Sequence, residues 1–400
     1  MDPPVTVGAI VVGAHVNGLG VMRALGPRGI PIVSISTRPF DIAHVSRWVH
    51  EHQPLPALHE RRDTLVELLE HHGARWKGSL LFPTNDDAVI AIAQHHERLS
   101  RWYRPTCPPW EVTSRLVDKD RMHDLAVDSG IDVPACHGPA RQVDPESPSL
   151  RYPLIVKPLR HDHLISMYGV KLFVARDPDA LARACRQLAA AGLEGLVFDA
   201  IPGPDSEIYV YCLYVDSRGE PSPGVTVRKL RQNPPFTGGA RVAEVVDEIP
   251  TLRGASIALL QRAGFHGLAF VEFKRDVRTG RFLFIEVNGR PVLFNSILPP
   301  TGLDLVGMAW ADLTTGDRRA PRSTAWRGTW IHLQADLLGS LRYHRKERLG
   351  LAALVAPYRR PKTFAVWSVN DPRPFLAQSR LLAGRALGAA PGTRRPETSL

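Results

Sequence analysis

Two glutamates, an asparagine and an arginine lie close together in a strongly apolar part of the chain: Glu272, Glu286, Asn288 and Arg290. The period-two alternation of a strand would project the last three from one face, together with Phe284. A buried carboxylate without a partner costs several kcal/mol, so we expect a cation between the two glutamates. Oxygen ligands of this kind suit Mg²⁺, and the arginine could hold a phosphoryl group or an acyl phosphate. The alternative is a β-hairpin whose acidic residues face water.

The chain has 400 residues, of which 44% are hydrophobic, enough for two or three packed domains and too many for a disordered chain. Its amino terminus shows no basic leader or cleavage site, and no run approaches the roughly 18 apolar residues of a membrane span. We therefore expect a cytoplasmic protein. The four cysteines match no metal-binding spacing and are expected to be reduced thiols.

The positive charge is concentrated at the carboxyl end. Residues 318–400 hold 16 Lys and Arg against 4 Asp and Glu, whereas the net charge of the whole chain is +10. Leu333, Leu337, Leu338 and Leu341 recur there at helical spacing, beside the basic run 342–348. Such helices could pack on the core or contact an anionic membrane surface peripherally, at the inner membrane face. A solvated basic tail is the alternative. Nucleic acid is not expected, because the arginines are not interleaved with aromatic residues.

The order of elements predicts an α/β fold followed by an α+β fold. An apolar run at 5–12, a turn with glycines at 13–20 and a second run at 30–35 indicate a β-turn-α-β opening. A parallel α/β domain should therefore occupy 1–110, with its ligand at the carboxyl ends of the strands. Residues 111–316 should form a strand-rich domain with lobes at 111–200 and 201–316, and 317–400 a basic, partly helical region with a frayed end.

This series of parts resembles the ATP-grasp superfamily, and within it the carboxylate-amine ligase or D-aspartate-ligase-like branch. The resemblance covers roughly residues 5–316 and implies a Rossmann-like amino-terminal domain followed by a two-lobed ATP-grasp domain. It is carried by the order of the motifs, which are Val7–Ile35, Asp118–Lys119, Pro153–Pro158 with Lys157, the hinge Val197–Gly203, Glu272, and Glu286-x-Asn288-x-Arg290.

The resemblance assigns roles to particular residues. Lys119, Lys157, Lys171, Phe198, Asp199, Ile201 and Glu207 would bind the nucleotide, Glu272, Glu286 and Asn288 would hold the metal ion, and Arg290, Arg231 and Lys229 would act in catalysis. Physical reasons accompany several of these roles. A lysine between strand and proline, as at Lys157, has a fixed stem that can aim its charge at a phosphate. The backbone of Asp199–Ile201 could read adenine, with apolar walls from Phe198, Ile201 and either Leu268 or Phe284.

Other roles stay open at this point. Glu207 could accept from ribose hydroxyls or be a solvated strand carboxylate. Arg231 is preferred to Lys229 because its planar fork suits phosphate, although a basic strand face in water would explain both. Polar residues at the strand ends of the first domain could hold a substrate or simply cap loops: His15, Asn17, Thr84, Asn85 and Asp86.

One departure from the family concerns the loop that covers the phosphates, which is usually rich in glycine. Residues 161–171 contain a single glycine, so side chains such as His161, His163, Ser166 or Lys171 would have to replace amide contacts, or the loop would close poorly.

The function that the resemblance implies is ATP-dependent ligation of a small-molecule carboxylate to an amine through an acyl phosphate, with ATP and Mg²⁺, or Mn²⁺, as cofactors. An alternative is an ATP-binding regulatory protein with weak catalysis. A further alternative is an NADP-dependent oxidoreductase that uses Gly13–Gly20, with Arg38 at a 2′-phosphate. The glycine spacing does not fit that alternative, because the third glycine of the dinucleotide motif is missing.

Overall fold

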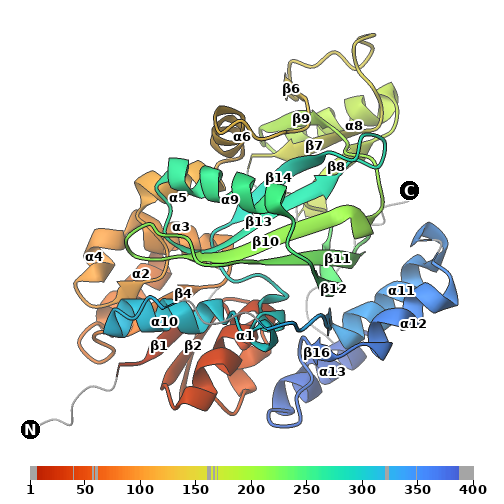
Figure 1. Ribbon diagram of the computed structural model, residues 1–400. Coiled ribbons are helices and arrows are strands. Elements are labelled where there is room, and N and C mark those ends of the chain that lie inside the picture. The colour runs from red at the N-terminus through yellow and green to blue at the C-terminus, as the bar shows by residue number, and fades with distance from the viewer. Residues whose placement is uncertain are drawn as a thin grey trace, which may run out of the picture.

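Within the residues that it describes, the computed structural model contains three β-sheets with helices packed against them (Figure 1). These residues are 7–38, 40–55, 58, 62–159, 164, 167–168, 170–319, 324–347 and 349–386, with the backbone alone for 343–347 and 385–386. The largest sheet lies between the amino-terminal sheet, at the bottom of Figure 1, and a smaller sheet at the top.

Short parallel strands form the amino-terminal sheet, in the order β3-β2-β1-β4-β5. Its central strand is buried on both faces, because Ala9 and Val11 pack in one core while Ile10 and Val12 pack in another. Burial on both sides explains the continuous apolar run. The elements are β1 (Ala9–Val12), α1 (Val16–Leu25), β2 (Ile32–Ser36), β3 (Glu51–Pro54), α2 (Arg62–His71), β4 (Leu80–Pro83), α3 (Asp86–Gln94), α4 (His96–Ser100) and β5 (Arg104–Pro105).

An antiparallel sheet follows, in the order β6-β9-β7-β8. Helix α8 covers it with Leu181, Ala184 and Leu188, which lie on one helical face and share a core with Leu154 and Val156. The elements up to this point are α5 (Trp110–Val117), α6 (Lys119–Asp128), β6 (Cys136–Pro139), β7 (Leu154–Pro158), β8 (Phe173–Ala175), α8 (Pro178–Ala190) and β9 (Gly195–Asp199).

The third sheet is mostly antiparallel and has the order β14-β13-β10-β11-β12-β15-β16. Its strands are β10 (Ile208–Val215), β11 (Val225–Asn233), β12 (Gly239–Val246), β13 (Gly267–Arg275), β14 (Phe282–Asn288), β15 (Thr329–Ile331) and β16 (Lys362–Phe364). The accompanying helices are α9 (Pro250–Ala263), α10 (Leu305–Thr315), α11 (Leu333–Glu347), α12 (Leu351–Arg359) and α13 (Arg373–Ala386).

The two faces of the large sheet contact different parts of the protein. On one face Val271 and Phe273 of β13 pack with Leu259 of α9. On the other face Leu268 and Phe270 belong to the core shared with the amino-terminal sheet. Further along that second face the strand turns polar, with Glu272 and Lys274 both lining a cavity. One face of β13 therefore packs two sheets together at one end and builds a site at the other.

Several segments after residue 317 pack against the rest of the described chain. Strands β15 and β16 extend the large sheet, and Asp371 binds the amino-terminal part of the chain. Its carboxylate accepts from Arg23 Nε at 3.1 Å and Ser46 Oγ at 2.7 Å, and from the Arg47 amide at 3.0 Å. The limits of the predicted domains stay a prediction.

The apolar residues of α11 do not all reach the core. Leu337 and Leu338 are 55% and 51% exposed, and Leu351 of α12 is 76% exposed. Among the described helices, none combines the length and the apolar character that a membrane crossing requires. The peripheral membrane contact stays a prediction.

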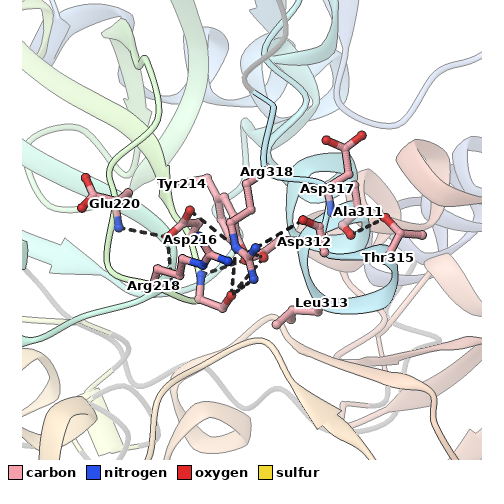
Figure 2. A network of polar contacts seen from close by, with 12 residues as sticks. Tyr214, Asp216, Arg218, Glu220, Ala311, Asp312, Leu313, Thr315, Asp317 and Arg318 are labelled. Carbon is pink, nitrogen blue, oxygen red and sulfur yellow. Dashed lines mark hydrogen bonds and ion pairs between the residues drawn. The ribbon is translucent and has the colours of Figure 1, made fainter.

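A buried carboxylate ties the turn after β10 to α10 (Figure 2). Asp312 accepts from the Tyr214 hydroxyl and the Ser217 amide, both at 2.7 Å, and pairs with Arg318 Nε at 2.8 Å. Because α10 also contacts α1, this network helps to hold the large sheet on the amino-terminal part.

Candidate active site

A cavity of about 1140 Å³ lies where the three sheets meet. His15 and Arg38 reach it from the amino-terminal sheet, Lys157 and Phe198 from the small sheet, and Glu272 from the large one. Its volume exceeds the roughly 300–1,000 Å³ of common small-molecule sites, so it has room for more than one ligand. Among the described residues that line it, 11 Lys and Arg face 8 Asp and Glu, a balance that favours an anionic ligand.

The two predicted metal-binding glutamates are direct neighbours. Glu272 of β13 pairs in register with Glu286 of β14, and the Asn288 amide donates to Glu286 Oε1 at 3.2 Å. The sequence prediction placed Phe284 on the same strand face as Glu286. A β-bulge separates the Glu272–Glu286 pair from the Phe273–Phe284 pair and interrupts this alternation, so that Phe284 packs with Phe273 in the core. Phe284 nevertheless lines the cavity together with Glu286.

Lysines neutralise both glutamates. Lys229 Nζ of β11 lies 2.7 Å from Glu272 Oε2, and Lys119 Nζ, at the start of α6, lies 3.4 Å from Glu286 Oε2. The described residues contain no cluster of three or more His, Cys, Asp and Glu side chains arranged to hold a metal ion. Two carboxylates and an amide oxygen nevertheless fit Mg²⁺, which takes few protein ligands and fills its shell with phosphate oxygens and water.

Two further lysines face these carboxylates from the small sheet. Lys157 of β7 and Lys171, just before β8, both line the cavity. Burial lowers the pKa of each ammonium group, and the charge of Glu286 partly reverses this effect. Lys157 Nζ also lies 5.5 Å from the centre of the Phe198 ring. The sheet register thus brings together cations from three separate parts of the chain.

The hinge after β9 borders the same cavity. Phe198, Asp199 and Ile201 line it, as the sequence predicted for residues around an adenine ring. The amides of Asp199 and Ala200 already donate to carbonyl oxygens of Ala135 and Pro153. If this segment contacts an adenine edge, the Ile201 amide and backbone carbonyl oxygens would make the hydrogen bonds. The Asp199 carboxylate lies 2.8 Å from His137 Nε2.

Glu207 does not take the predicted position. Its carboxylate accepts from Arg275 Nε at 2.7 Å and pairs with Arg228 at 3.6 Å, and the residue is not among those that line the cavity. Two partly exposed arginines satisfy this buried carboxylate, so the predicted ribose role is wrong.

Arg231 is likewise not among the residues that line the cavity. Irregular pairing of β11 with β12 around this residue turns its side chain toward α11, where it makes a two-pronged ion pair with Asp336 at 2.8 Å. Both side chains are 3% exposed. The preference for Arg231 over Lys229 is therefore wrong, because Lys229 is the residue that lines the cavity.

Arg290 lies in the cavity and is held from the amino-terminal sheet. Its Nε and its terminal nitrogen donate to Asp86 at 2.6 and 3.1 Å. Burial favours a higher pKa for Asp86, but the charge and hydrogen bonds of Arg290 outweigh it and lower the pKa to about 2.

For the other predicted substrate residues, loop capping explains most contacts. Asn17 donates to the carbonyl oxygens of Thr84 and Pro291, and Asn85 caps α3 by accepting from the Ala88 amide. Most of the predicted phosphate loop lies outside the described residues, including His161, His163 and Ser166.

Asp41 and Lys274 line the cavity and were not predicted. A positional signal existed for Asp41, which follows the second strand at the edge where ligands bind in parallel sheets. Lys274 carried the period-two spacing from Glu272, which also places it on the cavity face.

No family model matches the chain. The D-aspartate ligase of Enterococcus faecium (strain Aus0004) is 22% identical over 293 residues, which are 66% of this chain and 68% of that protein.

Solved structures share the fold. N5-carboxyaminoimidazole synthetase from Staphylococcus aureus, complexed with ADP, aligns with a TM-score of 0.64 and 13% identity over 86% of this chain and 87% of that one. L-amino acid ligase from Bacillus licheniformis aligns with a TM-score of 0.60 and 16% identity, over 80% of this chain and 78% of that one. Against the Rhizobium etli pyruvate carboxylase the TM-score is 0.60 at 17% identity, and 76% of this chain covers 28% of that longer one.

Proposed function

We propose that this chain, which has the fold of the ATP-grasp superfamily, is an ATP-dependent ligase that joins a carboxylate to an amine. The carboxylate would be activated as an acyl phosphate, and Mg²⁺ would be required. The comparisons confirm the predicted resemblance to the superfamily. The observation that carries the proposal is the in-register pair Glu272 and Glu286, faced by lysines from three parts of the chain.

In the proposed reaction, a carboxylate oxygen of one substrate attacks the γ-phosphorus of ATP and the bond to ADP breaks. The amine then attacks the acyl carbon, loses a proton to solvent and releases phosphate. Lys119, Lys157 and Lys171 would bind the phosphates of ATP, while Lys229 would neutralise charge that gathers during transfer. Arg290 would bind the transferred phosphoryl group through its guanidinium.

Glu272, Glu286 and Asn288 would hold the Mg²⁺ ion. When bound, this ion would neutralise phosphate charge and polarise the phosphoryl oxygens. Lys119 and Lys229 are counter-ions for the same carboxylates, which offsets the cost of placing two acids at the end of an apolar strand.

The test is ADP release by Glu286→Gln protein, supplied with ATP, Mg²⁺ and a panel of carboxylates and amines. Turnover should fall by roughly 10²-fold or more, because charge stabilisation at the reacting phosphate is lost. Glu220→Gln removes an exposed carboxylate outside the cavity and should keep wild-type turnover. Wild-type turnover in Glu286→Gln would remove the metal role.

A binding measurement separates ligation from the alternatives. Thermal stabilisation by ATP with Mg²⁺, but not by NADP, would support the ligase and argue against the oxidoreductase. ATP affinity without ADP release for any pair of substrates would instead support a regulatory ATP-binding protein.

A further inference from the structure

Exposed apolar side chains gather on helices α11 and α12, outside the cavity. Leu341 and Leu351 are each 76% exposed, and Leu337, Leu338 and Val355 are exposed as well. We call these five residues the α11–α12 surface. In Figure 1 the two helices lie next to one another at the edge of the molecule, and a hydrogen bond joins them. Single exposed leucines are common, but a group on two neighbouring helices is a candidate interaction surface.

Buried polar contacts fix which side of each helix faces the protein. Asp336 of α11 is buried and accepts from Arg231 at two positions 2.8 Å away. Arg231 also donates to the Ala353 carbonyl oxygen of α12 at 3.1 Å, and the Tyr358 hydroxyl donates to Asp336 at 2.7 Å. Rotation of either helix would break this network, so the exposed leucines cannot turn inward.

Helix α12 is apolar around most of its circumference. Residues 351–358 contain no charged side chain, and 351–353, 355 and 356 are exposed. A helix at the surface of a globular protein ordinarily presents polar residues on its outer side. Helix α12 instead presents apolar residues on several sides, which favours a partner that covers it.

The charges beside the α11–α12 surface are all positive. Residues 337–342 and 349–362 contain no Asp or Glu. They contain four basic residues, all exposed: Arg342, Arg359, Arg360 and Lys362. One of these arginines, Arg360, also pairs with Glu244 of β12. Apolar side chains bordered by positive charge alone fit a partner that is both apolar and anionic.

This charge pattern argues against a second copy of the chain as the partner. A symmetric dimer would bring the same surface of both copies together, and their like charges would repel. A lipid bilayer requires no complementary groove, because apolar side chains can enter between its headgroups. Long basic side chains beside them can reach anionic headgroups at the same time.

We propose that the α11–α12 surface docks on a bilayer that contains anionic lipids. Leu341 and Leu351 enter the headgroup region, and the four basic residues contact headgroup phosphates. The docking is peripheral. It does not depend on the proposed ligase function, since none of these described residues lines the cavity.

Co-sedimentation of the full chain with lipid vesicles tests the proposal. Vesicles of phosphatidylcholine alone are compared with vesicles that also contain phosphatidylglycerol, at low and at high salt. Wild-type protein should bind the anionic vesicles at least tenfold more tightly than the neutral ones, since each well-placed basic residue adds about fivefold. Its affinity for the anionic vesicles should fall as salt screens the charges.

A double variant tests the apolar contribution. Leu341→Ser combined with Leu351→Ser should weaken binding to anionic vesicles at least tenfold, because two leucines no longer enter the bilayer. Val369→Ser is the control, since Val369 is 80% exposed but lies outside the α11–α12 surface. It should bind as the wild type does. Unchanged thermal unfolding midpoints would verify that both proteins are folded.

A pair of arginine variants tests where the charge acts. Arg359→Gln should weaken binding to anionic vesicles about fivefold. Arg183→Gln removes an exposed arginine from α8, on the small sheet, and should leave the affinity unchanged.

Several results would overturn the proposal. Wild-type protein that does not bind anionic vesicles would do so. Wild-type affinity in the double leucine variant, or equal losses in Arg359→Gln and Arg183→Gln, would assign the binding to the net charge of +10 rather than to this surface. Sedimentation velocity without lipid adds a last check, because a wild-type dimer that dissociates in the double leucine variant would make a second copy the partner. None of these outcomes bears on ADP release, which tests the proposed function separately.

Discussion

Replacement of Asp336 by asparagine should destabilise the fold strongly. This carboxylate accepts from Arg231 at two positions 2.8 Å away, lies 3.3 Å from Arg241 Nε and accepts from the Tyr358 hydroxyl at 2.7 Å. The exposed fractions of the three charged side chains are 3% or less. Water therefore cannot replace the lost charge around the arginines.

The expected loss in the free energy of unfolding follows from this burial. Removing one partner of a buried ion pair costs about 3–5 kcal/mol, because the remaining charge stays desolvated. Asp247→Asn is the matched control, because Asp247 pairs with Arg327 but is 94% exposed, and such surface pairs contribute about 1 kcal/mol or less.

Urea denaturation followed by tryptophan fluorescence provides the measurement. With a slope near 3 kcal/mol per molar urea, the Asp336→Asn midpoint should fall by roughly 1 M or more at unchanged slope, and the Asp247→Asn midpoint should barely move. Equal midpoints for the two variants would refute the view that Arg231 belongs to a buried structural ion pair, and would reopen its catalytic role.

Two further predictions concern ionisation. Burial, with His332 and Arg38, lowers the pKa of His15 from 6.5 to about 3, so its contribution to stability is complete above pH 6.5 and declines as the pH falls. The free energy of unfolding should therefore drop by about 2 kcal/mol between pH 6.5 and 5 through this group, and His15→Gln should remove that part of the slope in urea titrations at both pH values. Asp86→Asn should lower kcat for ADP release roughly tenfold through misplacement of Arg290, with ATP affinity retained and partial rescue by Asp86→Glu; unchanged kcat would show that Asp86 does not position Arg290.

Much of the site could be predicted because the spacing of polar residues along single strands indicates it. Polar residues in an otherwise apolar stretch are easily recognised in the sequence. Four of them lie in one cavity of the structure: Glu272, Glu286, Asn288 and Arg290. Lys157 is similarly marked by its strand and the following proline. These signals depend on spacing along a single strand, which the sequence displays directly.

The amino-acid order by itself determined the strands, their apolar faces and the types of polar residue available to the cavity, because backbone geometry converts spacing along the chain into a face. Tertiary structure alone decided which charges meet. Arg231 and Asp336 are distant in the sequence, as are Asp86 and Arg290, and neither pair leaves a local pattern. The bulge in β14 likewise arises from pairing with β13. Ion pairing depends on distances of a few ångströms between separate elements, and only the packed sheets establish those distances.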